Sequence, residues 1–284
     1  MTTLDMGALR EWLGRKETAI DYVAVPTVHR GSAMLDRDDP FPEIGDPLPP
    51  GWHALLFPRV VRHSEVGADG HPKRGDFLPP VPLPRRMFAG KRVNFIHDLQ
   101  VGDKVEKVST IKALQEKTGR TGQMVFLTVL HEMIGPRGLA LTEEQDIVYR
   151  HAPDPAAPPP PPQAAPAEAV WKRTIVPDPV LLFRFSALTF NGHRIHYDLP
   201  YVTGVEGYPG LIVNGGLTTL LLFELARTSN ASPVVRFESR NVRPLFVGQP
   251  LHLCGAPSAD GRSAKLWATN AEGALALTAE AWFA

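Results

Sequence analysis

The most continuous apolar pattern in the chain runs from Tyr208 to Ala226. It opens with glycines and is then apolar on nearly every side, which is typical of a buried helix that begins at a glycine turn. Eight other segments combine apolar residues with turn signals at their ends and predict strands of antiparallel sheet. These segments are 92–99, 104–115, 123–134, 140–150, 234–240, 250–255, 263–269 and 274–283.

The N-terminal part of the chain gives weaker signals. Residues 5–16 are predicted to form a helix, because their apolar positions recur at i, i+3 and i+4. Residues 22–28 alternate weakly and are interpreted as a short strand. From 36 to 84, prolines and glycines are too frequent for long regular elements. The aromatic residues in this stretch indicate an ordered loop that covers other parts of the protein.

A proline-rich segment separates two halves of similar length. Residues 151–169 contain eight prolines, five of them consecutive. Such a segment favours the polyproline II conformation and is not expected to bury any surface, so we interpret it as a linker between domains 1–150 and 170–284. A proline-rich ligand for a partner domain is the alternative interpretation.

Two short motifs occur once in each half. Leu99-Gln-Val-Gly102 reappears as Leu245-Phe-Val-Gly248, and the sequence 139–144 reappears with one change at 275–280. The same order at nearly the same spacing indicates a duplicated unit of one helix followed by four antiparallel strands. We therefore expect an α+β fold in which each half wraps a sheet around one helix.

Composition narrows the classes of function. Thirty basic residues balance thirty acidic residues among 284, so the chain lacks the broad basic face that nucleic-acid binding requires. No apolar run is long enough to span a membrane, and the N-terminus lacks the pattern of a signal peptide. Cys254 is the single cysteine, which excludes an intrachain disulfide. We expect a cytoplasmic protein that binds neither nucleic acid nor membrane.

Polar and titratable residues crowd into the segment 187–198. They are Asn191, His193, Arg194, His196 and Asp198. This density is more typical of a site than of a core. The first half has no counterpart, so the second half is expected to be catalytic, and the first half to complete the sheet and help bind a substrate.

Several blocks of the sequence resemble one family of enzymes. Asn191-Gly-His-Arg-Ile-His196 resembles the (R)-specific enoyl-thioester hydratase signature of MaoC-like hotdog enzymes, and 187–198 as a whole is similar to the type 2 hydroxyacyl-thioester dehydratases. Further blocks are similar to the fused double-hotdog hydratases that include mesaconyl-CoA and itaconyl-CoA hydratases. These blocks are 46–53, 67–72, 77–90 and 143–149. The resemblance implies a double hotdog that reversibly adds water to an enoyl-CoA with a C5 dicarboxylic acyl group.

The resemblance also assigns roles to the catalytic residues. His196 takes the place of the family's histidine, and its ordinary pKa near neutrality suits a general base. We expect it both to remove the proton from water and to return it to Cα. Asn191 stands where simpler hydratases carry Asp; an amide cannot accept a proton, so we expect it to aim the water. Gly215 matches the position whose backbone N–H faces the thioester carbonyl, where the N-terminus of a helix favours negative charge.

Three arginines are candidates for binding the substrate. Arg194 could pair with a substrate carboxylate, or form a structural ion pair. Arg85 and Arg86 are candidates for the phosphates of coenzyme A or for the same carboxylate. Coenzyme A enters as part of the acyl-CoA substrate, and we expect no other cofactor. Gly67-Ala-Asp-Gly-His71 lacks the ligand count of a metal site and is interpreted as a loop, so no metal is expected.

Other functions of the same fold stay open. A 3-hydroxyacyl-thioester dehydratase of fatty-acid synthesis would act on longer chains, and a hotdog thioesterase would release free thiol. The amide of Asn191 also leaves room for a non-catalytic protein that binds acyl-CoA. Whether the chain pairs with another copy into a homo-oligomer is open as well.

Overall fold

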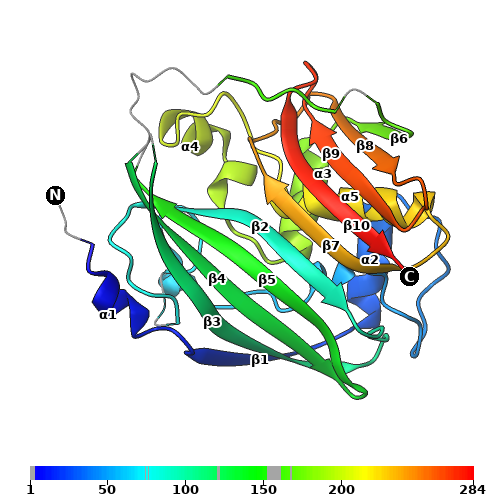
Figure 1. Ribbon diagram of the computed structural model, residues 1–284, viewed down its shortest axis with the longest axis horizontal. Helices are drawn as coiled ribbons and strands as arrows, with labels where there is room; N and C mark the ends of the chain where they lie inside the picture. The colour runs from blue at the N-terminus through cyan, green and yellow to red at the C-terminus, as the bar shows by residue number, and fades with distance from the viewer. Residues whose placement is uncertain (1–3, 74, 76, 120–121, 152–160, 167) are drawn as a thin grey trace.

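Ten strands form one antiparallel sheet (Figure 1). The computed structural model describes residues 4–73, 75, 77–119, 122–151, 161–166 and 168–284. The strands are β1 (Lys16–Tyr22), β2 (Arg85–Phe95), β3 (Lys104–Gly119), β4 (Gly122–Gly135), β5 (Gly138–Arg150), β6 (Trp171–Ile175), β7 (Val234–Asn241), β8 (Leu251–Pro257), β9 (Ser263–Thr269) and β10 (Leu275–Phe283). Each of the eight predicted strand segments overlaps one of them. The two edge strands, β1 and β6, lie outside the predicted segments.

The two halves of the chain follow the same strand order. The order β1-β3-β4-β5-β2 in the first half corresponds to β6-β8-β9-β10-β7 in the second, as the repeated motifs predict. β2 pairs with β7, from Gly90 opposite Arg240 to Asn94 opposite Arg236, so the halves share one sheet. A Cβ at Gly90 would lie 2.2 Å from the carbonyl oxygen of Ser239, so glycine is required for this close approach.

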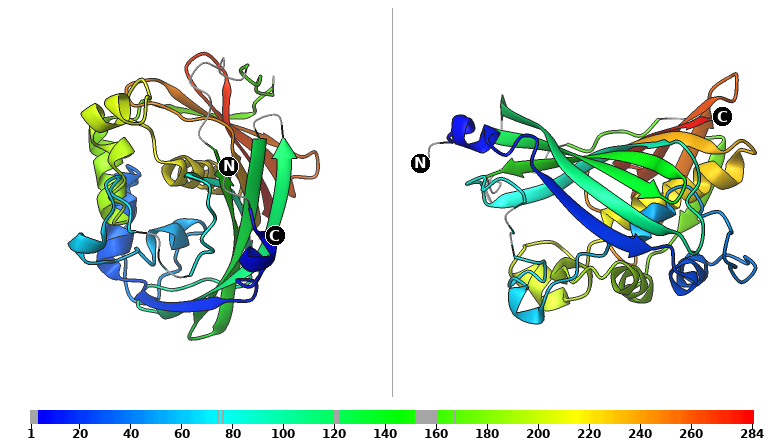
Figure 2. Two further views of the ribbon diagram at one scale, coloured as in Figure 1. Left: turned by 90° about the vertical axis from the view of Figure 1, so that its left-hand side faces the viewer. Right: turned by 90° about the horizontal axis from the view of Figure 1, so that it is seen from below.

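Most helices lie on one face of the sheet and form a second layer (Figure 2). The helices are α1 (Met6–Arg10), α2 (Val25–Met34), α3 (Pro179–Leu188), α4 (Leu199–Gly204) and α5 (Gly215–Ser229), with the 3-10 helices η1 (Trp52–Leu55), η2 (His63–Glu65) and η3 (Arg194–His196). α5 contacts all five strands of the second half.

α5 confirms the buried helix predicted within 208–226. Its residues from Leu217 to Ala226 are all buried, which explains the absence of a polar face. The preceding residues do not join the helix, because Ile212 forms a bridge with Phe246 and Val213 bonds to Leu245. Among the described residues, no helix combines the length and the hydropathy needed to cross a bilayer.

The first half is built differently beneath its strands. Among the described residues of the loop 36–84, Trp52 and Leu55 of η1 belong to the same core cluster as α5. The predicted strand 22–28 is wrong, because β1 ends at Tyr22 and Pro26 fits the first turn of α2. The predicted helix 5–16 is shortened to α1, because Gly14, with φ 79°, turns the chain into β1.

The predicted linker is described only in part. Residues 152–160 and 167 lie outside the described residues. The described stretch 161–166 contacts the second half: Ala164 forms a bridge with Ala274, and the N–H of Leu275 donates to the carbonyl oxygen of Gln163 at 2.9 Å. This part of the segment therefore does not run free of the sheet. The domain boundaries at 151–169 stay a prediction.

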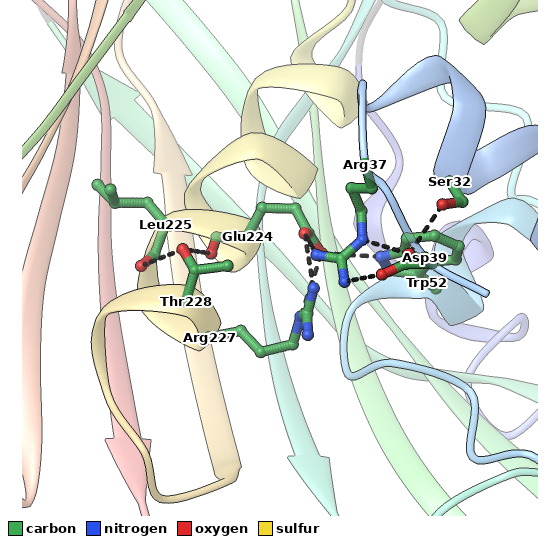
Figure 3. A network of polar contacts seen from close by, with 8 residues as sticks. All are labelled: Ser32, Arg37, Asp39, Trp52, Glu224, Leu225, Arg227 and Thr228. Carbon is green, nitrogen blue, oxygen red and sulfur yellow. Dashed lines mark hydrogen bonds and ion pairs between the residues drawn. The ribbon is translucent and has the colours of Figure 1, made fainter.

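A buried carboxylate of α5 joins the two halves (Figure 3). Glu224 accepts hydrogen bonds from the indole N–H of Trp52 at 2.9 Å and from Arg37 at 2.6 Å, both in the first half. Arg227, one turn further along α5, donates to the same carboxylate at 2.8 Å. Burial raises the pKa of Glu224, whereas the indole bond and Arg37 oppose that shift. The loop 36–84 is thus fixed to α5 by polar as well as apolar contacts.

A second buried ion pair lies within the first half. Lys91 Nζ on β2 donates to Glu143 Oε2 on β5 at 2.9 Å, and His53 Nε2 lies 3.0 Å from the same oxygen. Burial alone would raise the pKa of Glu143. The charge of Lys91 and the bond from His53 outweigh it and hold the pKa well below its usual range. This carboxylate is therefore ionised although it is buried.

Candidate active site

The candidate site forms where the loop 67–71 of the first half meets η3 of the second. The backbone N–H of Arg194 donates to the carbonyl oxygen of Asp69 at 2.9 Å. Gly70 has φ 87°, and a Cβ there would lie 1.9 Å from the carbonyl oxygen of Gly192. Only glycine fits both the conformation and the distance. Backbone contacts therefore fix this loop against the predicted motif 187–198.

His196 is held as a neutral imidazole with one nitrogen free. Its side chain is buried, at 7% exposure, and Nδ1 lies 2.7 Å from the carbonyl oxygen of Ile212. A carbonyl only accepts, so Nδ1 carries the proton and Nε2 keeps its lone pair. Burial lowers the pKa of His196 to about 4, against the opposing effect of the Ile212 hydrogen bond. The ring is therefore ready to accept a proton at neutral pH.

The N-terminus of α5 lies close to this histidine along the chain. Ile212, which anchors the ring, precedes Gly215 by three residues, and three residues span at most about 11 Å. The side chain of the N-cap residue Asn214 does not cap α5. The first-turn N–H groups, including that of Gly215, therefore have no partner among the described residues. Such groups at a helix N-terminus favour negative charge. The predicted role of Gly215 at the thioester carbonyl stays a prediction.

Asn191 lies in the turn between α3 and η3. Its side-chain oxygen accepts a hydrogen bond from the backbone N–H of His193 at 3.0 Å. Its amide nitrogen donates to no other described residue, so it remains able to donate to a bound water or substrate. The predicted role of aiming a water stays a prediction.

Of the two roles considered for Arg194, the geometry favours the structural ion pair. Its guanidinium lies 2.7 Å from Asp198, donates to the carbonyl oxygen of Ala68 at 2.9 Å and lies 4.1 Å from the ring centre of Tyr201. Asp198 also caps α4 by accepting the N–H of Tyr201 at 3.0 Å. The side chain of Arg194 thus holds the loop 67–71 and α4 in place.

Arg86 lies closer to the histidines than its position in the sequence indicates. It stands near the start of β2, and its positive charge contributes to the lowered pKa of His193. It makes no hydrogen bond or ion pair with another described residue, so its guanidinium is available to an anion. Arg85 lies 3.8 Å from Glu206 and is partly engaged. Substrate binding by either arginine stays a prediction.

The structure adds two residues that the sequence reasoning missed, Asp69 and His71. Nδ1 of His71 donates to Asp69 Oδ2 at 3.1 Å, and the His71 ring lies 3.9 Å from the ring of His193. His193 in turn lies 5.5 Å from His196. Burial, then the charges of His71 and His196, lower the pKa of His193 to about 3. In the sequence, the one local indication of Asp69 and His71 is the compact polar motif 67–71, which lies inside a proline-rich stretch.

These residues also have the composition of a metal site. One ligand atom from each of Asp69, His71 and His193 lies within 4.8 Å of the others. A carboxylate and two imidazoles suit Zn²⁺ and related ions. Two of the three groups are already hydrogen-bonded to each other. The expectation of no metal therefore stays a prediction.

Comparison with solved structures defines the class of fold. The chain is similar to a MaoC-like dehydratase from Phytophthora capsici, with a TM-score of 0.70 and 12% identity over 99% of each chain. It is also similar to a conserved hypothetical protein from Mycobacterium tuberculosis with a double hotdog fold, with a TM-score of 0.58 and 15% identity over 95% of this chain and 96% of that one. The molecule is thus an α+β protein with a double hotdog fold.

Comparison of sequences defines the family. Residues 51–247 match the model of hydroxyacyl-thioester dehydratase type 2, and the chain belongs to this family of enzymes. It is 44% identical to a mesaconyl-C4-CoA hydratase from Chloroflexus aurantiacus over 268 residues, which cover 94% of this chain and 95% of that protein. The expected MaoC-like, double-hotdog resemblance is confirmed.

Proposed function

We propose that the protein reversibly adds water to an α,β-unsaturated acyl-CoA, with His196 as the general base. The observation that carries this proposal is the orientation of the imidazole. Its Nδ1–H is fixed on the Ile212 carbonyl, so Nε2 carries the lone pair, and Ile212 precedes the first residue of α5, Gly215, by three residues. Membership of a dehydratase family supports the same reaction.

Each step of the reaction then has a group to perform it. Nε2 of His196 removes a proton from water as its oxygen attacks Cβ of the substrate. Negative charge develops on the thioester oxygen, where the N–H of Gly215 and its neighbours on α5 stabilise it. Asn191 donates from its amide to orient the water. Coenzyme A enters as part of the substrate, and no step requires a metal.

For the acyl group we propose a C5 dicarboxylic chain, mesaconyl-CoA or itaconyl-CoA. The name of the Chloroflexus relative supports the first, and the guanidinium of Arg86, which pairs with no other described residue, offers a partner for the second carboxylate. The name of the family supports a second candidate, the dehydration of 3-hydroxyacyl thioesters of fatty-acid synthesis. A cytoplasmic location and pairing with a second copy stay predictions.

Parallel assays test this proposal. Loss of the enoyl-thioester absorbance is followed with mesaconyl-C4-CoA, itaconyl-CoA and crotonyl-CoA. We expect the dicarboxylic substrates to be consumed faster, and Arg86→Met to lower kcat/KM for these but not for crotonyl-CoA. Turnover of crotonyl-CoA alone would exclude the dicarboxylic assignment. Release of free thiol would identify a thioesterase, and tight binding of acyl-CoA without turnover would identify a non-catalytic binding protein.

The acidic limb of the pH profile is a further test of His196. The base must be neutral, and burial holds the pKa of His196 at about 4. We therefore expect kcat/KM for hydration to fall with a midpoint near pH 4, whereas an ordinary histidine would give a midpoint of about 6.5. Initial rates at constant ionic strength, with circular dichroism at each pH, check this. A midpoint close to that of an ordinary histidine would contradict the buried, neutral state.

A further inference from the structure

We propose that Asp69 and His71, contributed by the first half, form the second proton-transfer group of the site. This inference rests on the proposed hydratase function. Hydration requires one group to take a proton from water and another, or the same one recharged, to deliver a proton to Cα. Asn191 has no proton that it can exchange at neutral pH. If a group other than His196 delivers the proton to Cα, it must therefore come from outside the motif that carries Asn191 and His196.

Asp69 and His71 have the geometry of a carboxylate–histidine pair. Asp69 binds His71 twice, accepting the backbone N–H at 3.0 Å with Oδ1 and the ring Nδ1–H at 3.1 Å with Oδ2. This arrangement fixes the ring and leaves Nε2 as the reacting nitrogen. Burial raises the pKa of Asp69, but the hydrogen bonds from His71 outweigh it and keep the carboxyl ionised.

The pair is adjacent to the proposed base. The rings of His71 and His193 are 3.9 Å apart, and those of His193 and His196 are 5.5 Å apart. The charge of His71 contributes to the lowered pKa of both other histidines, so all three rings lie within electrostatic reach. His71 is 35% exposed and Asp69 44% exposed, whereas His196 is 7% exposed. The pair can thus exchange protons with solvent more freely than the buried base.

The loop that carries the pair is held in place by the backbone. Gly70, between the two residues, packs against the carbonyl of Gly192 at a distance that excludes any Cβ. The carbonyls of the two residues before it, Ala68 and Asp69, both accept hydrogen bonds from Arg194. Three contacts from the second half therefore fix the orientation of a first-half pair toward the site.

The proposed step balances as follows. The water oxygen bonds to Cβ while His196 takes one of its protons, and the π electrons of the double bond move onto the thioester as an enolate. The imidazolium of His71 then gives a proton to Cα, which completes the C–H bond and leaves His71 neutral. The proton on His196 returns to His71 through solvent. Each turnover adds one water and leaves both rings unchanged.

Substitutions in the full-length protein test the inference. We expect His71→Gln to lower kcat at least about 100-fold, with KM changed by less than about threefold. Added imidazole should restore turnover to His71→Ala, because the position is partly exposed. Asp69→Asn should lower kcat about 10- to 100-fold. The control is His63→Gln in η2, an exposed histidine expected to keep wild-type rates.

Three results would overturn the inference. Wild-type rates in folded His71→Gln would show that the pair is dispensable. A loss of activity in His71→Ala that imidazole does not restore would indicate a structural role. Loss of wild-type activity with a chelator and its return with Zn²⁺ would make the two residues metal ligands. Turnover that depends on His196 but not on His71 would leave the proposed function standing. An inactive wild type would remove both.

Discussion

His196→Ala is expected to lower kcat for hydration by about 100- to 10,000-fold, because the variant loses the group that removes a proton from water. The effect should lie mainly in kcat, since Nε2 is proposed to act on the water and not to bind the acyl-CoA. The measurement is the loss of enoyl-thioester absorbance at saturating substrate, with the thermal unfolding temperature recorded for each variant.

Two further variants distinguish the role of His196 as a base from the structural role of its hydrogen bond to Ile212. In His196→Asn the amide nitrogen occupies the region of Nδ1 and keeps a donor for the Ile212 carbonyl, but no basic nitrogen remains. We expect this variant to fold like the wild type and to be as inactive as His196→Ala. Asn191→Ala, which leaves the base intact, should lose less activity. If His196→Asn kept more than about a tenth of the wild-type rate, proton abstraction by this ring would be excluded.

Lys91→Met is expected to destabilise the protein by about 3–5 kcal/mol, because it leaves the buried carboxylate of Glu143 without its ammonium partner. Burial then disfavours the ionised form of Glu143. The remaining hydrogen bond from His53 does not replace the positive charge of Lys91. Denaturant unfolding followed by fluorescence measures the effect. Glu143 should also become easier to protonate, so the variant should lose less of its remaining stability on acidification than the wild type does.

The neighbouring residue of β5 provides a matched control. Glu144 pairs with Lys112, whose side chain is 49% exposed, on the other face of the strand. Lys112→Met should lower the free energy of unfolding by less than about 1 kcal/mol, because an exposed ion pair is only slightly more favourable than the interactions of the two groups with water. The double variant Lys91→Met/Glu143→Gln should recover part of the loss. Equal destabilisation by Lys91→Met and Lys112→Met would contradict the role given to the buried pair.

The sequence predicted the elements whose patterns are local. The apolar run that contains α5 and the segments overlapping eight strands could be recognised, because burial of a whole helix and alternation along a strand both leave regular signals. The prediction of a strand at 22–28 is wrong because it gave more weight to the strand preference of an aromatic residue and the valines than to Pro26. This proline instead lies in the first turn of α2. Edge strand β1 was missed because its residues are mostly exposed and carry no apolar alternation.

Candidate site residues could be selected only where they are close in sequence. His196 and Asn191 belong to one short motif, so resemblance and chemistry both indicated them as candidates, and their catalytic roles stay a prediction. Asp69 and His71 could not be assigned, because nothing in a single sequence indicates that a loop packs against a motif in the other half. Arg194 illustrates a different limit: its choice of partner, Asp198, depends on the fold of η3 and α4.

The central pairing of β2 with β7 has a consequence for how the site is assembled. Groups from both halves meet at η3, and the halves are parts of one covalent chain joined edge to edge in a single sheet. Bringing these groups together is therefore a unimolecular event. Dilution separates two independent copies of a protein. It does not separate groups that belong to the same covalent chain.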